Sequence, residues 1–234
     1  MNTFCGLTPE DWHAVLLSVR IAALAVLLSL PAGIALGWLL ARKSFRGKAL
    51  LETFINLPLV LPPVVTGLLL LYLLGKRGWI GHWLFATFGL EIALTWRAAV
   101  LAVAVMGFPL MVRAIRLAFA SFDMRLYQVA RSLGARPIDA FFSISVPLAR
   151  DGIIAGTVLA FARGLGEFGA TLMFAGITPE TRTLPIQVYL LNNQPGDLAE
   201  ARMWRVVVVS VLIAFAALAA SEFLQRRGSR QEVV

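Results

Sequence analysis

The sequence predicts an all-α integral membrane protein, and this prediction rests on its composition, its long apolar runs and the placement of its charges. Of the 234 residues, 59% are hydrophobic and only 15% are charged, and the mean hydropathy is +0.80. A chain with so little polar surface does not dissolve as a globule. Because backbone polar groups must be paired inside a bilayer, long apolar runs indicate membrane-spanning helices.

Five apolar runs meet or approach the roughly 20 residues that a spanning helix needs. We therefore expect about five transmembrane helices in a single domain that occupies residues 1–234. A further apolar piece at residues 79–90 is too short to cross and carries His82, so it is predicted to be interfacial or re-entrant. The five runs cover residues 14–41, 50–74, 94–111, 153–175 and 206–224.

Basic residues are distributed unevenly between the two sides of this arrangement. Most of the 21 Lys and Arg residues fall in residues 42–48, 113–150 and 226–230, which five crossings place on the same side. Cytoplasmic loops retain Lys and Arg, so the N-terminus is predicted outside and the C-terminus inside. The net charge of +8 follows from this asymmetry, and no basic patch is interleaved with aromatic residues as nucleic-acid binding requires.

The second apolar run contains three prolines, Pro58, Pro62 and Pro63. Proline removes a backbone donor and clashes with a preceding carbonyl, so this helix is predicted to be broken or kinked. Irregular backbone at membrane depth is tolerated only against protein or a watery cavity. The segment therefore lies either near a hydrated path, with Pro62 and Pro63 as candidate path residues, or at a structural kink that faces neighbouring helices.

Residues 123–150 form a polar segment that the orientation places in the cytoplasm. Asp123 can cap a short helix over residues 124–133, and Gly134 can end it in a left-handed conformation. Pro137 can then start the next helix. This helix either lies in the groove of a soluble partner or rests on lipid headgroups. Its apolar residues at helical spacing are Leu126, Val129, Ala130 and Leu133.

The same segment carries a motif that resembles a known family. The pattern Gln128-Val-Ala-x3-Gly134-x9-Ile144-x-Val-Pro147 resembles the EAA loop of binding-protein-dependent ABC-transporter permeases, Glu-Ala-Ala-x3-Gly-x9-Ile-x-Leu-Pro. The spacing is retained, while Gln128, Val129 and Val146 depart from the family residues, so contact with a partner should depend more on shape and on Arg131. The resemblance implies a type I ABC importer-like fold whose ATPase-coupling residues are Gln128, Val129, Ala130, Arg131, Leu133, Gly134, Ala135 and Pro147.

Two further stretches narrow the resemblance to one branch of these permeases. Residues 57–67 with 75–78, and residues 161–176 with 183–185, are similar to molybdate permeases. The resemblance implies ATP-driven import of an oxyanion, foremost molybdate, from a periplasmic binding protein across a bacterial or archaeal cytoplasmic membrane. It also implies a homodimer and two ATPase subunits that bind ATP and Mg²⁺. Tungstate and sulfate or thiosulfate permeases remain alternatives, as does a secondary anion transporter, although we find no internal repeat or convincing ion relay.

Arg163 and Glu167 are the most informative charges of the chain. They are four residues apart, so on one helix they share a face and can pair near the bilayer midplane. They either line the oxyanion path, with Glu167 moderating the positive potential of Arg163, or form an ion pair that braces the helix bundle. Thr157 and Thr171 flank the pair and can donate hydroxyl groups to an oxyanion or bond back to their own helix.

The remaining motifs do not support an enzyme. Residues 164–169 match G-x-G-x-x-G but are predicted to lie inside a spanning helix, where the glycines, like Gly33, Gly37, Gly152 and Gly156, allow close helix approach. The chain has no P-loop pattern, so nucleotide binding requires a separate subunit. The two histidines and the lone cysteine have no metal-ligand spacing, and we expect no cofactor, metal or catalytic residue in this chain.

Overall fold

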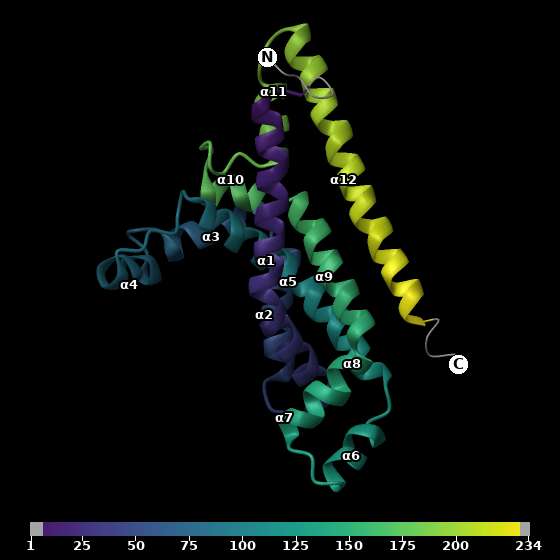
Figure 1. The fold of residues 1–234 in the computed structure, drawn as a ribbon. Helices are drawn as coiled ribbons and strands as arrows, with labels where there is room; N and C mark the ends of the chain where they lie inside the picture. Colours follow the sequence, from purple (N-terminus) through teal and green to yellow (C-terminus); the bar gives the residue numbers. More distant parts are fainter. Residues whose placement is uncertain (1–6, 230–234) are drawn as a thin grey trace.

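The computed structural model describes residues 7–229, with side chains through residue 219, and confirms the all-helical membrane architecture. Three helices are long and apolar enough to cross a membrane singly, and two bent helix pairs bring the number of crossings to as many as five. Figure 1 shows these elements as one elongated bundle, with α6 at the end opposite the N-terminus. The two ends of the bundle are thus separated along its long axis, as helices that cross a bilayer require, and which end is cytoplasmic stays a prediction from the basic residues.

The three single crossings are α1 (Pro9–Arg42), α5 (Trp96–Ser121) and α12 (Asp197–Ser229). Each helix is longer than its predicted apolar run. The prediction ended each run at charged residues, whereas the helix continues through them. The start of α1 is set by local capping, since Asp11 Oδ2 accepts hydrogen bonds from Thr8 N at 2.9 Å and Thr8 Oγ1 at 2.8 Å. Pro9 then occupies the first turn, where its missing donor costs nothing.

The second crossing is broken, as its prolines predict. Helices α2 (Lys48–Val60) and α3 (Pro63–Leu74) meet at an angle of 114°. Leu61 and Pro62 form the break, and Pro63 is the first residue of α3. The short α4 (Trp79–Phe88) follows and projects sideways from the bundle in Figure 1, with Trp79 and Trp83 exposed. Its ten residues are too few to cross, as predicted.

The prediction of one helix over residues 153–175 is wrong. Helix α9 (Arg150–Leu165) ends before the separate α10 (Gly169–Ala175), and residues 166–168 join them without helical structure. The G-x-G-x-x-G stretch therefore spans a helix break and does not lie inside a helix. Glycine is a poor helix former, and Gly164, Gly166 and Gly169 cluster at this break, which accounts for the interruption.

Close contacts between small residues hold α1, α5 and α9 together. A Cβ atom on Gly37 would lie 2.6 Å from Ile115 Cγ2, and one on Gly152 would lie 2.2 Å from Ala118 Cβ. These separations are shorter than van der Waals contact, so the helices reach this distance only with glycine. The predicted role of these glycines is confirmed. Met111, Ile115 and Phe119 of α5 fill the core between the three helices.

A buried polar cluster ties the outer end of α1 to α11 (Leu184–Asn192) and α12. The carboxylate of Asp11 is fully buried and accepts hydrogen bonds from Arg202 Nε at 2.9 Å and Gln187 Nε2 at 2.8 Å. Ser18 Oγ accepts a further bond from Leu184 N at 2.7 Å. These polar contacts are important for α12, because only 6% of its membrane-spanning window is buried.

Candidate coupling loop and substrate path

The predicted cytoplasmic helix is present as α6 (Arg125–Ser132). Asp123 Oδ1 accepts a hydrogen bond from Arg125 N at 2.9 Å, so Asp123 pairs the first donor of the helix, although the helix starts one residue later than predicted and Met124 holds the N-cap position. Gly134 has a φ of +92°, the left-handed conformation expected at the helix end. Pro137 is the first residue of α7 (Pro137–Ala140), also as predicted. The local sequence thus defines a short helix between two fixed ends.

The apolar face of α6 is open to solvent. Leu126, Val129 and Leu133 are 54%, 56% and 84% exposed, and no residue of α6 is buried. Arg131 Nη1 donates a hydrogen bond to Ala135 O at 2.6 Å, so its guanidinium closes the loop after the helix. An amphipathic helix with an exposed apolar face is suited to lie in the groove of a partner.

The sequence did not reveal how this segment is anchored to the bundle. After α7, the chain forms a π-helix, η1 (Phe141–Ser145), and then α8 (Val146–Leu148), which contains Pro147. The Phe141 ring lies 5.6 Å from the Trp38 ring of α1 and 6.1 Å from the Phe119 ring of α5. In the sequence, only the aromatic residues between positions 119 and 142 could have indicated this packing. Through Phe141, the segment that carries α6 packs against the two central helices.

The predicted ion pair is present, but its position differs from the prediction. Arg163 Nη1 lies 2.7 Å from Glu167 Oε2. Arg163 lies in the last turn of α9, and Glu167 lies in the break beyond that helix, so the pair marks a helix end and does not share a continuous helix face. The buried Glu167 also accepts a hydrogen bond through Oε1 from Ala170 N at 2.9 Å. The carboxylate therefore holds the end of α9 against the start of α10.

The other predicted path residues divide into two groups. Thr157 Oγ1 donates to Ile153 O at 2.7 Å, which is the back-bonding alternative. Thr171 is fully buried in α10, and its Oγ1 has no hydrogen-bond partner in the described part of the chain. Pro63 lies on the facing helix, because a Cβ on Gly169 would be 3.0 Å from Pro63 Cβ. The structure thus brings the start of α3, with Pro62 and Pro63, against the start of α10. Thr157 lies near the middle of α9, away from this contact.

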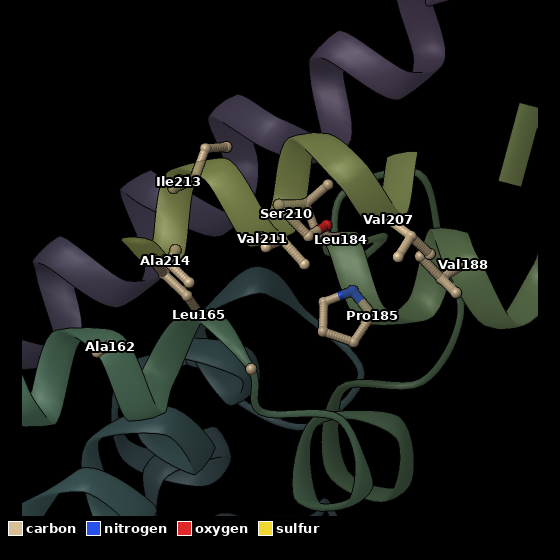
Figure 2. Close-up of a pocket in the computed structure, with 11 residues that line it drawn as sticks. Ala162, Leu165, Leu184, Pro185, Val188, Val207, Ser210, Val211, Ile213 and Ala214 are labelled. Atoms are coloured by element: carbon tan, nitrogen blue, oxygen red, sulfur yellow. The ribbon is translucent and has the colours of Figure 1, made fainter. Parts of the chain in front are cut away.

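A hollow of about 390 Å³ lies between α9, α11 and α12 and is lined mainly by apolar side chains, unlike the candidate substrate path (Figure 2). Its labelled side chains are apolar except for Ser210, whose hydroxyl donates to Val206 O at 2.8 Å. A lining without available donors does not bind an oxyanion. Within the described residues there is also no group of three His, Cys, Asp or Glu side chains that could hold a metal ion, and Cys5 lies outside them.

Broken crossings and an exposed helix at one end define this chain as a multi-helix membrane protein. The chain belongs to the family of binding-protein-dependent transport system inner membrane components, whose model matches residues 33–230. It is therefore a multi-pass protein of the inner membrane.

Individual relatives are more specific. The chain is 54% identical over 221 residues to the molybdenum transport system permease protein ModB of Escherichia coli K12, covering 94% of this chain and 96% of that protein. It is 46% identical to ModB of Haemophilus influenzae over 92% of this chain and 93% of that protein. Both relatives are named as permease proteins of molybdenum transport systems.

Solved structures confirm the fold class. The MetNI methionine ABC transporter in an inward-facing conformation matches with a TM-score of 0.66 and 16% identity over 94% of both chains. A bacterial ABC transporter that imports alginate matches with a TM-score of 0.72 and 17% identity over 94% of this chain and 80% of that chain. At this identity the likeness shows the fold alone, which is that of the ABC importer permeases.

Proposed function

We propose that this chain is the transmembrane permease subunit of an ATP-driven oxyanion importer whose cargo is molybdate. The observation that carries this proposal is the 54% identity to a molybdenum permease over nearly the whole of both chains. The family description supports delivery of the cargo by a binding protein on the outer side of the membrane. The membrane is the cytoplasmic membrane of a bacterium or archaeon.

The ATPase-coupling site is the exposed α6 helix and the segment that anchors it. Its apolar side chains, exposed by about half or more, fit a groove on a cytoplasmic ATPase, which binds ATP and Mg²⁺ in place of this chain. Movement of α6 passes through Phe141 to α1 and α5, because these rings are in contact. The proposed coupling residues are Gln128, Val129, Ala130, Arg131, Leu133, Gly134, Ala135 and Pro147.

The importer contains two copies of this chain and two ATPases. As many as five crossings are few to enclose a hydrated path, so a second copy supplies the other wall around a two-fold axis. Closure of the ATPases on ATP brings the two α6 helices together and opens the path outward, and hydrolysis restores the inward-facing state. Oxyanion choice resides chiefly in the binding protein, since a path that binds tightly cannot release its cargo.

The cargo passes the junction of the broken helices. Arg163 supplies positive potential there, and Glu167 at 2.7 Å reduces it so that a dianion is not trapped. Thr171, with its unpartnered hydroxyl, is the nearby candidate donor, and Pro62 and Pro63 shape the facing helix start. The alternative role of the ion pair, bracing the bundle, predicts that removing the pair lowers flux only to the extent that it lowers assembly.

Transport by vesicles reconstituted with the permease, its ATPase and its binding protein tests the proposal. We expect uptake of labelled molybdate that requires ATP and the binding protein. Competition by tungstate and sulfate then ranks the three oxyanions, and preference for sulfate would replace molybdate as the cargo. Uptake that continues without the ATPase and collapses with the proton gradient would instead identify a secondary anion transporter.

A further inference from the structure

A second cation lies on the same side of the α5–α9 pair as Arg163. Arg113 of α5 lines an open hollow of about 640 Å³ together with Leu110, Leu117 and Leu159. Leu159 precedes Arg163 by four residues on α9, so the two side chains share one helix face. The hollow therefore continues along the surface that Arg163 reaches.

This surface is the side of the pair that the rest of the chain leaves open. Met111, Ile115 and Phe119 point into the core shared with α1 and α9. Residues advance by about 100° each around a helix, so Arg113 and Leu117 point about 200° away from Met111 and Ile115. Both are exposed, in agreement with this geometry.

Arg113 lies in the inner half of α5. Contacts of Gly107 with Ala160 and of Gly156 with Met111 show that α5 and α9 run antiparallel, which places Arg163 level with about residue 104 of α5. Arg113 is nine residues further along α5, which at 1.5 Å per residue is about 13 Å closer to the cytoplasm. The two guanidiniums therefore lie at successive depths on one surface.

The charge of Arg113 is uncompensated, unlike that of its neighbours. Arg163 pairs with Glu167 at 2.7 Å, and Arg116 pairs with Glu52 of α2 at 3.0 Å. No ion pair or hydrogen bond involves the Arg113 side chain in the described part of the chain. An unpaired guanidinium at membrane depth is costly against lipid and is stable beside water or an anion.

We propose that Arg113 is an anion-binding residue in the inner half of the substrate path, where it attracts the oxyanion from the Arg163 level and passes it to the cytoplasm. This inference rests on the proposed function. A neutral Arg163–Glu167 pair followed by a single positive charge gives a potential that draws a dianion inward. Arg116 lines the same hollow but is paired with Glu52, so a single uncompensated guanidinium faces the anion, and one such contact binds weakly enough for release.

Thiol labelling tests whether the hollow beside Arg113 belongs to the substrate path. Cys5 is the only cysteine, so Cys5→Ser gives a cysteine-free parent into which Leu117→Cys is introduced, a position that lines the hollow and leaves Arg113 in place. In the reconstituted complex with ATPase and binding protein, we expect a water-soluble sulfonate thiol reagent to modify the new cysteine. Molybdate at ten times its dissociation constant should slow this reaction about tenfold. Reaction only with a membrane-soluble maleimide, or reaction without protection by molybdate, overturns the inference.

Uptake measurements test the role of the charge. Arg113→Gln should lower the maximal rate of molybdate uptake about tenfold or more, while Arg113→Lys retains most of it. Assembly with the ATPase should be normal in both variants. Arg46→Gln, which removes an exposed cation from the short loop after α1, is the matched control and should transport normally.

The same measurements separate this inference from the proposed function. If the Cys5→Ser parent takes up molybdate with ATP and the Arg113→Gln variant equals it, only the inference fails. If the parent itself shows no ATP-dependent uptake, the proposed function fails, and the inference that rests on it fails too.

Discussion

The contact between α3 and α10 gives a prediction whose magnitude follows from the structure. A Cβ atom on Gly67 would lie 2.6 Å from the Ala170 carbonyl oxygen and 2.7 Å from Ala170 Cα. Because these are backbone atoms, no side-chain rotation relieves the overlap, and we place Gly67→Ala near the upper end of overpacking costs, about 3 kcal/mol. Alanine regains about 1 kcal/mol of helix propensity, which leaves a net loss of about 2 kcal/mol.

This loss can be measured as a lower unfolding temperature of the purified permease in detergent. At about 2–4 °C per kcal/mol for a chain of this size, we expect the midpoint to fall by about 4–8 °C. Displacement of α10 should also lower molybdate uptake, because Glu167 and Thr171 move with it. Gly166→Ala is the matched control: its Cβ meets only Arg163 O at 4.0 Å, so its stability should change by less than about 0.5 kcal/mol. An unchanged midpoint together with normal uptake for Gly67→Ala would refute the reasoning.

Three further predictions follow from the site and its supports. Gly134→Val should abolish stimulation of the ATPase by the permease, because a β-branched residue is strained at a φ of +92°. Gly134→Asn should retain much of this stimulation, and equal stimulation in both variants would contradict the docking role of α6. Asp11→Ala should destabilise the protein by about 1.5–3 kcal/mol through loss of charged hydrogen bonds, and Glu10→Gln, at an exposed pair, by less than about 1 kcal/mol in thermal unfolding. Arg163→Ala combined with Glu167→Gln should restore assembly relative to Arg163→Ala alone without restoring flux; restored flux would favour the bracing role.

The sequence predicted the fold class and the break in the second crossing because both depend on local rules. Apolar runs require helices in a bilayer, and Pro62 with Pro63 cannot continue one. The hydrogen bond of Asp123 to the start of α6 and the end of this helix at Gly134 were predictable for the same reason. Family resemblance supplied the proposed docking role of the α6 segment, which periodicity alone left open between a partner groove and lipid.

Long-range packing was beyond these rules. The break between α9 and α10 was missed because the residues around Glu167 are apolar enough for a crossing, and their glycines were interpreted only as contact points. The Glu167 carboxylate cap on Ala170 N becomes visible only when the two helices are placed in space. Likewise, the proposed role of Arg113 could not be predicted from the sequence, because it depends on the face of α9 that lies beside this residue.

The exposure of α6 has a consequence for how this segment varies among related chains. Because none of its residues is buried in its own bundle, exchanges at its surface cost the permease little folding energy. The glutamine at position 128 is therefore tolerated by the fold, and under the proposed coupling role its identity is set by the complementary surface of the ATPase. Permease and ATPase sequences should accordingly change in step at this contact, and exchanging α6 between related importers should exchange the ATPase that each one accepts.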